Sequence, residues 1–169
     1  CVISVKIEAE ITNGGFHMSF VLNNSDEQQL SLFDSFNSLT DREKRFLDKS
    51  WAKYFAEHIF PKIDEKPYAV LYSGKDSRPN TPVNIQIGAL LIKELTNLSD
   101  EELPNSLMFD INFQYALHTT SFIEQPLRDR TLGRFPARSN AYETEYGDDL
   151  WHHTIKALTA EIDKITKIV

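Results

Sequence analysis

Runs of apolar residues at three- and four-residue steps, each opening at a helix-start signal, constrain the fold of this chain more than any other feature. The first run opens at Thr40, where the sequence TDRE matches a capping box between Thr40 and Glu43. Steps of this size place side chains on one face of a helix. The apolar members are Leu47, Trp51, Tyr54, Phe55 and Ile59, and the run stops at Pro61. We therefore predict a helix from Thr40 up to Pro61 with this face in the core.

Residues 62–80 are predicted to be a linker, with a short extended segment at AVLY (69–72). Thr81 and Pro82 then supply an N-cap and a first-turn proline. The helix that they open has one apolar face, made by Val83, Ile87, Leu90, Leu91 and Leu95.

A second capping box, Ser99 with Glu102, opens the next helix, which Leu103 and Leu107 continue. Pro104 falls late for a first turn and predicts an irregular start or a kink. The two helices joined across residues 97–100 form a helix-turn-helix-like pair, although a generic αα-hairpin has the same pattern.

The segment MFDINFQYALH that follows offers three anchors for the core: Phe109, Phe113 and Leu117. His118 lies beside this aromatic set. We interpret it as a hydrogen-bonded structural histidine rather than a catalyst.

A long amphipathic helix is predicted at the C-terminal end of the sequence, with Asp148 as its cap. Its apolar seam has a spacing close to a heptad repeat: Trp151, Ile155, Leu158, Ile162, Ile165 and Val169. The seam either packs on the preceding helices or forms a homodimer through residues 151–169. Because the sequence stops on this seam, we expect that the full protein continues.

Composition limits the class of protein. The 169 residues suit one domain with a substantial core. No apolar run is long enough to span a membrane, and a single cysteine, Cys1, permits no disulfide framework. We therefore expect a cytoplasmic location and no membrane partner.

The motifs of several enzyme classes are missing from the sequence. It has no phosphate-binding loop, no GxSxG and no cysteine near a histidine. His152 and His153 lack the spacing of helical zinc ligands, and Asp148 and Asp149 are better explained as partners of a helix start. We expect no metal or other cofactor in this chain.

An arginine segment points to DNA as the leading partner. Four arginines, Arg128, Arg130, Arg134 and Arg138, lie between Pro126 and Asn140 against one aspartate. The last three recur at every fourth residue, so a helix through Thr131 would align them on one face. A solvated helix face has the same pattern. The net charge of −7 opposes tight DNA binding, so we expect a weak or assisted contact with phosphates.

Four sequence segments occur in order between residues 78 and 135: RPNTPVNIQIGALLIKEL, LSDEEL, YALHTTS and RTLGRF. With these segments the chain, from about Met18 onward, resembles the N-terminal, InsH-type domain of bacterial insertion-sequence transposases of the DDE class. The resemblance implies recognition of the element's terminal inverted repeats and assembly of the transposase complex. It also implies that catalytic carboxylates and their divalent metal ions belong to a separate downstream domain, so that this chain is not itself an enzyme. Arg130, Arg134 and Arg138 match the family's RTLxRF-type arginine segment.

One departure from the family concerns Pro136, which stands where the family commonly has another arginine. Proline removes an amide donor and costs about 3 kcal/mol inside a helix, so we predict that the helix ends at Phe135 or kinks there and that Arg138 leaves the stripe. The hypothesis that follows is a partial or decayed transposase copy. The alternative function is a protein-interaction or oligomerisation module that does not bind DNA.

Three segments are expected along the chain. Residues 1–17, before Met18, have the character of a translated leader or of an added sequence foreign to the protein, with a β-hairpin arm as the alternative. Residues 18–80 form an N-terminal helical segment and linker, and residues 81–169 form the transposase N-terminal helical domain.

Overall fold

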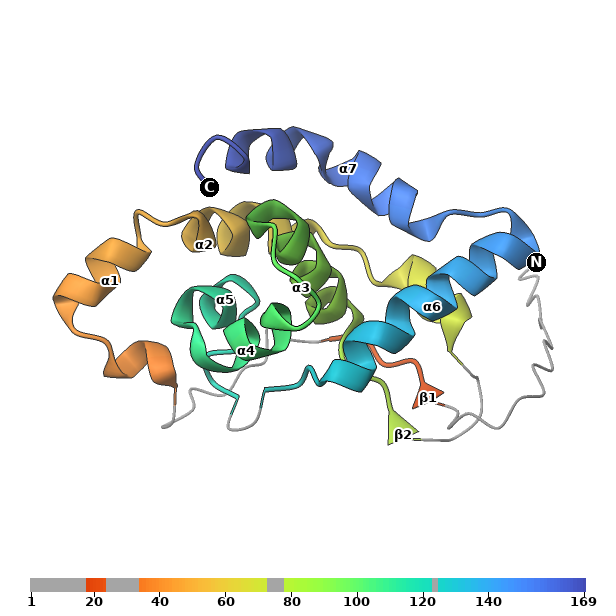
Figure 1. Ribbon diagram of the computed structural model, residues 1–169, viewed down its shortest axis with the longest axis horizontal. Helices are drawn as coiled ribbons and strands as arrows, with labels where there is room; N and C mark the ends of the chain where they lie inside the picture. The colour runs from red at the N-terminus through yellow and green to blue at the C-terminus, as the bar shows by residue number, and fades with distance from the viewer. Residues whose placement is uncertain (1–17, 24–33, 73–77, 123–124) are drawn as a thin grey trace, which may run out of the picture.

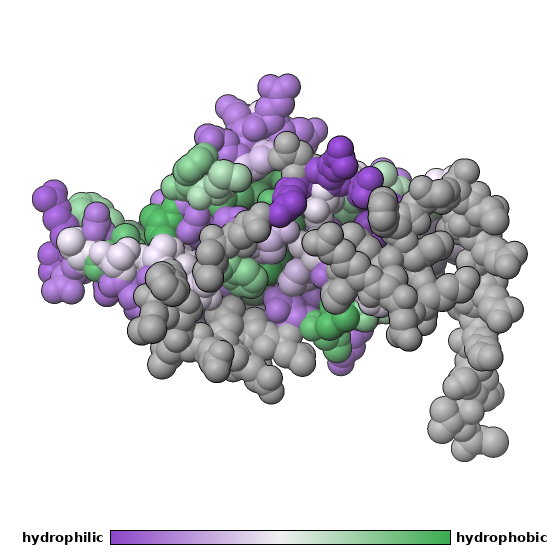
Figure 2. Space-filling view, turned by 90° about the horizontal axis from the view of Figure 1, so that it is seen from below, coloured by the Kyte–Doolittle hydropathy of each residue, from purple (hydrophilic) through white to green (hydrophobic). Residues whose placement is uncertain are grey.

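The protein is an all-α domain, as the periodicity predicts. A computed structural model describes residues 18–23, 34–72, 78–122 and 125–169, so the predicted leader at 1–17 lies outside the described residues. The domain is elongated, with α1 (Asp41–Leu47) at one end of its long axis and α6 (Asp129–Tyr146) toward the other (Figure 1). Seen from below, the α1 end projects from the body (Figure 2). The remaining α-helices are α2 (Trp51–Tyr54), α3 (Val83–Thr96), α4 (Glu102–Phe109), α5 (Ile111–Ala116) and α7 (Leu150–Ile165).

Shorter elements connect these helices. The 3₁₀ turns are η2 (Ser35–Ser38), η4 (Phe60–Lys62) and η5 (Lys66–Leu71), and η3 (Phe55–Ile59) is a π-helical turn. Two two-residue segments, β1 (Met18–Ser19) and β2 (Arg78–Pro79), pair in parallel. No helix in the described ranges is long and apolar enough to cross a membrane.

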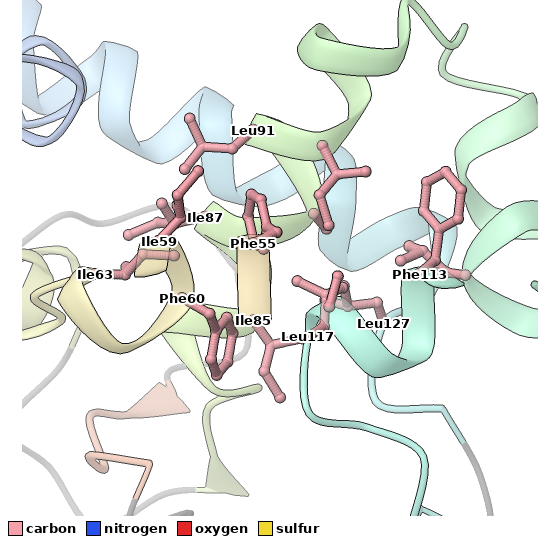
Figure 3. Packing of buried hydrophobic residues seen from close by; sticks show 14 of the residues in the cluster. Phe55, Ile59, Phe60, Ile63, Ile85, Ile87, Leu91, Phe113, Leu117 and Leu127 are labelled. Atoms are coloured by element: carbon pink, nitrogen blue, oxygen red, sulfur yellow. The ribbon is translucent and has the colours of Figure 1, made fainter. Parts of the chain in front are cut away.

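The core surrounds α3. Buried side chains from η3, η4, α3 and α5 meet in one cluster, which Figure 3 shows from close by. The sequence predicted one apolar face on α3, but Ile85, Ala89 and Ile92 on other faces are buried as well. Gly88 permits this close packing, because a Cβ there would lie 2.6 Å from Leu117 Cδ2. The core draws on residues from both 18–80 and 81–169.

The N-terminus of α3 is capped by a residue distant in sequence. Glu65 Oε2 accepts hydrogen bonds from the amides of Val83 and Asn84 at 3.0 and 3.1 Å. The prediction of Thr81 as the N-cap is therefore wrong: Pro82 holds the N-cap position, and its side chain makes no capping bond. The buried carboxylate of Glu65 takes the place of a local capping side chain. It satisfies amides that have no partner within the helix and complements the positive end of the helix dipole.

The predicted helix from Thr40 to Pro61 is instead a broken series. Its capping box is confirmed, with Glu43 N donating to Thr40 Oγ1 at 3.3 Å and Thr40 N donating to Glu43 Oε2 at 2.7 Å. However, α1 ends at Leu47, and Ser50 Oγ donates to the Leu47 carbonyl at 2.7 Å. A local side-chain bond thus competes with helix continuation. Of the apolar side chains predicted to face the core, Leu47, Phe55 and Ile59 are buried. Trp51 and Tyr54 are half-buried and pack against the core.

Residues 62–72 pack into the domain rather than forming an open linker. The predicted extended segment AVLY overlaps the 3₁₀ turn η5, which contradicts that expectation. The preceding residue, Tyr68, is fully buried, and its hydroxyl lies 3.1 Å from the Leu150 carbonyl and 2.8 Å from Thr154 Oγ1. Burial raises the pKa of Tyr68 to about 12. The tyrosine anchor folds this segment against α7, a long-range contact that sequence periodicity does not encode.

The chain turns sharply between α4 and α5, and this turn overturns one predicted core anchor. Asp110 Oδ1 accepts from Asn112 N at 2.8 Å and starts a new helix. Phe109, just before the turn, is 77% exposed, whereas Phe113 and Leu117 are buried as predicted. His118 is hydrogen-bonded, as predicted, since its Nε2 lies 3.0 Å from the Ala56 carbonyl.

The helix-turn-helix-like pair forms from α3 and α4, with the left-handed Asn97 ending α3. Its capping box is confirmed, since Ser99 N donates to Glu102 Oε2 at 2.9 Å. Helix α4 begins regularly only at Glu102, which places Pro104 within the first turn, where a missing amide is tolerated.

The C-terminal helix packs on its own chain. Leu158 and Ile165 are fully buried, while Val169 is 52% exposed. The cap is Asp149, which accepts from His152 N at 2.8 Å, and the predicted cap Asp148 lies instead 3.4 Å from His153 Nδ1. The seam residues thus contact the preceding elements, as the first of the two predicted alternatives requires.

Glu161 connects α7 to α2 and to η4. Its carboxylate accepts from Lys62 Nζ at 2.8 Å and from the Tyr54 hydroxyl. The bond from Lys62, followed by that from Tyr54, lowers the pKa of Glu161 to about 2. The same carboxylate raises the pKa of Tyr54 to about 12.

Replacing Glu65 with alanine tests the long-range cap. Glu65→Ala leaves the amides of Val83 and Asn84 buried without their acceptor, so we expect the free energy of unfolding to fall by about 1–3 kcal/mol. Urea unfolding at pH 7 measures it, with the exposed Glu101→Ala as the control. Equal stability of the two variants would contradict the capping role.

A pH series tests the Glu161 contacts. Because the folded pKa lies near 2 and the ordinary value is 4.5, the unfolded chain binds more protons between these pH values. The stabilisation is therefore fully present above pH 4.5 and lost as the pH falls toward 2. We expect Glu161→Gln to be less stable than wild type at pH 7 and the gap to close in acid, whereas the exposed Asp163→Asn should track wild type. A gap that stays constant with pH would refute the assignment.

Candidate nucleic-acid interface

Helix α6 carries all four predicted arginines on or beside it. It runs from Asp129 to Tyr146 with Pro136 inside, so the first of the two predicted alternatives, that the helix ends at Phe135, is wrong. Leu132 and Phe135, one turn and one residue before the proline, are both buried. Burying these anchors offsets the missing hydrogen bond, because tertiary packing supplies most of the stability of helices in proteins.

The arginines differ in exposure along the helix. Arg130 and Arg134 are exposed, as is Arg128 at the N-cap, whereas Arg138 is half-buried. Four residues advance an α-helix by about 400°, so each step of the stripe drifts by about 40°. Two steps turn Arg138 toward the packed side, where Ser139 and Phe135 are buried.

Arg138 lies against the aromatic ring of Tyr72, the C-cap residue of η5. Its guanidinium carbon lies 5.0 Å from the centroid of the Tyr72 ring, a cation–π arrangement. Tyr72 also contacts Phe20, with ring centroids 5.6 Å apart. Tyr72 was not predicted to contact Arg138, because its only local signal is its place in the short apolar run AVLY, which predicts an extended segment. Arg138 thus leaves the exposed stripe, at a position where helical drift turns it toward this ring.

The charges on α6 run against its own dipole. Arg130 lies in the first turn, after Asp129, while the last turn holds Glu143 and Glu145 and no basic residue. Each such misplaced terminal charge is unfavourable by about 0.3–1 kcal/mol at low ionic strength. The basic half of the helix is therefore not arranged for helix stability. An anion held at this end would relieve the mutual repulsion of the cations.

The helix-turn-helix-like pair does not offer a comparable surface. Nine of the residues of α3 are buried, from Val83 to Ile92 with the exception of Leu90. A helix enclosed in this way cannot enter a DNA groove, and α4, the second helix of the pair, carries no basic residue between Glu102 and Phe109. Among the described residues, α1 also exposes Arg42 and Arg45, but they stand beside the acidic Asp41 and Glu43, whereas Arg130 and Arg134 of α6 are exposed with no acidic residue between them.

The described residues hold no group of three or more His, Cys, Asp or Glu side chains that could bind a metal ion. His152 and His153 lie on the exposed side of α7, with ring centroids 6.4 Å apart. The two-metal chemistry of DNA strand transfer requires carboxylates that converge on ions roughly 4 Å apart. The described residues do not fit that requirement, and no catalytic step is assigned to them.

Comparisons with known proteins give one match. A family model described as "Transposase domain (DUF772)" matches residues 38–138, which extend from η2 to the middle of α6 and include all four arginines. No curated protein and no solved structure matches the chain.

Replacing Pro136 with alanine tests how α6 is maintained. The variant regains a helix amide and removes a ring from the preceding turn, so we expect unfolding to require about 1–2 kcal/mol more free energy. Thermal and urea unfolding measure this, with the exposed Ala137→Ser as a control at the neighbouring position. A loss of stability would show that the proline ring contributes packing that outweighs the hydrogen bond.

Proposed function

The chain belongs to the DUF772 family of transposase domains, and we propose that it serves DNA transposition by contacting DNA through the exposed arginines of α6. In this proposal Arg130 and Arg134 bind phosphates, with Arg128 beside them at the helix start. The domain would position the element's terminal repeats and help to assemble the transposase complex. The carboxylates and divalent ions of a DDE-type reaction would come from a domain outside these residues.

The observation that carries the proposal is the charge pattern of α6, with arginines at its start and glutamates at its end, which is opposite to the pattern that the helix dipole favours. Arginines that face solvent in the first half of a helix gain little from the helix itself. They gain from phosphates, which accept bidentate hydrogen bonds from guanidinium groups. Helix N-termini favour phosphates for the same electrostatic reason.

The geometry favours phosphate contact over base reading. The two exposed helical arginines, Arg130 and Arg134, are one turn apart, and Arg138 is engaged with Tyr72. Farther along α6, Glu143 and Glu145 would repel a duplex that followed the helix axis. The contact is thus limited to the first half of the helix. Phosphate contacts of this kind position a protein on DNA without specifying sequence.

The overall charge sets the strength of this contact. A net charge of −7 repels DNA at long range, so we expect binding that is weak, sensitive to salt and aided by other parts of an assembled complex. The acidic surface is also the observation that favours the second candidate, a protein-interaction module with no DNA role.

A fluorescence-anisotropy titration separates the two candidates. We expect Arg130→Ala with Arg134→Ala to weaken binding to any duplex by about tenfold or more and to lower the slope of log affinity against log salt by about 2. The control is Lys156→Ala with Lys167→Ala, which removes the same charge from exposed positions on and after α7.

The comparison of the two double variants decides the outcome. Equal weakening by both would mean that net charge, and not the α6 face, governs binding. No binding of the wild-type chain at low salt would favour the protein-interaction module. A loss restricted to one duplex sequence would show base reading and contradict the phosphate-only contact.

A further inference from the structure

Gly133 lies inside α6, where a glycine weakens the helix. Glycine lowers the stability of a helix interior relative to alanine, because its backbone loses more conformational freedom on folding. Proteins use glycine where the backbone conformation, or the close approach of another group, excludes a side chain. A Cβ built on Gly133 meets no atom within 4 Å, so no described residue of the chain requires a glycine at this position.

The two other glycines in the described ranges differ from Gly133, because the structure shows why each is a glycine. A Cβ at Gly88 would lie 2.6 Å from Leu117 Cδ2, so the packing of the core excludes a side chain there. Gly147 ends α6 with a φ of 70°, a left-handed conformation that favours glycine. At Gly133 both the helical backbone and the open space would accept a side chain. The reason for this glycine therefore lies outside the described chain.

Gly133 belongs to the exposed face of α6 that carries the arginines. Each residue advances an α-helix by about 100°, so Ala137, Arg130 and Arg134 follow Gly133 in one direction around the helix, at about 40°, 60° and 100°. All four residues are exposed. Two long cationic side chains therefore stand along one edge of this face. The opposite edge, made by Gly133 and Ala137, is low, and we call it the low edge.

The charges beside the low edge favour an anionic group. The segment from Arg130 to Ala137 contains two arginines and no acidic residue. Guanidinium groups bind phosphates through paired hydrogen bonds, which form only when the phosphate lies in line with the planar fork. A side chain at position 133 would hold a polyanion away from the helix, whereas glycine lets it lie against the helix backbone. The low edge thus suits a chain of phosphates that passes beside both arginines.

We propose that the sugar–phosphate backbone of DNA lies directly against α6 at Gly133, and that the missing side chain sets how closely Arg130 and Arg134 approach their phosphates. Gly133 is a positioning residue, since it supplies no side-chain group of its own. The inference rests on the proposed DNA contact of α6. It adds a steric requirement at a neutral residue, which the arginines alone do not impose.

Adding a side chain at position 133 tests the proposal, in an anisotropy titration of the 169-residue chain with a labelled duplex at several salt concentrations. Gly133→Leu should weaken binding about tenfold and lower the slope of log affinity against log salt by about 2, as the loss of both arginine contacts would. This substitution changes no charge, so a smaller slope reports that phosphates have been displaced from the arginines. Ala157→Leu, at an exposed position on α7, is the control and should bind like wild type.

Thermal unfolding of the same variants separates displaced DNA from a damaged fold. Alanine and leucine are better helix formers than glycine, so Gly133→Ala and Gly133→Leu should each melt about 2–4 °C above wild type. Gly133→Ala adds only a methyl group into open space and keeps the test decisive if leucine disturbs the helix. It should weaken DNA binding in the same direction as Gly133→Leu but to a smaller extent. Weaker binding by a more stable variant is the signature of the proposal.

The outcomes distinguish this inference from the proposed function. If both variants of Gly133 bind like wild type while Arg130→Ala with Arg134→Ala binds more weakly, the proposed function stands and the role of Gly133 is overturned. Equal weakening by Ala157→Leu overturns the role of Gly133 as well. If the arginine double variant binds like wild type, or the wild-type chain binds no duplex at low salt, the proposed function fails and this inference fails with it.

Discussion

The fold depends on the enclosure of α3, which requires that Glu65 satisfy the amides at its start. A central helix buried on nearly all sides cannot leave its first N–H groups to water, and Pro82 offers no side-chain acceptor there. The carboxylate at 65 therefore fixes residues 62–72 against the helix and brings Tyr68 to α7. Around this arrangement η3, α5 and α6 pack, and Gly88 allows Leu117 to approach closely.

Local signals were sufficient for part of this structure. Both capping boxes, the buried members of the apolar runs from Phe55 to Leu107, and the all-α class follow from spacing and cap chemistry alone. The predictions that the structure contradicts share a cause. Glu65 as the cap of α3, the break after Leu47 and the exposure of Phe109 each depend on a turn or a contact that periodicity does not contain. Sequence periodicity assigns a face to a helix, but not the residue at which a helix stops.

Helix α6 likewise combines a feature that local spacing predicts with one that depends on a contact distant in sequence. The spacing of Arg130 and Arg134 predicted an exposed basic face, and both side chains are exposed. The helix does not end before Pro136, because the buried Leu132 and Phe135 anchor it on the core at this point. Arg138 turns toward Tyr72 by the drift of a four-residue repeat on a 3.6-residue helix. The transposase-domain family and a basic half-helix set against its dipole point to one surface, the exposed face in the first half of α6.

Hydrogen–deuterium exchange of the chain with and without a short duplex at low salt tests the DNA contact most directly, because it reports where the duplex lies without any substitution. We expect slower exchange in peptides that cover residues 128–138, to the same extent with a terminal-repeat duplex and a scrambled one, and no change in α7. Protection centred on the α3–α4 pair or on α7, with residues 128–138 unaffected, would contradict it.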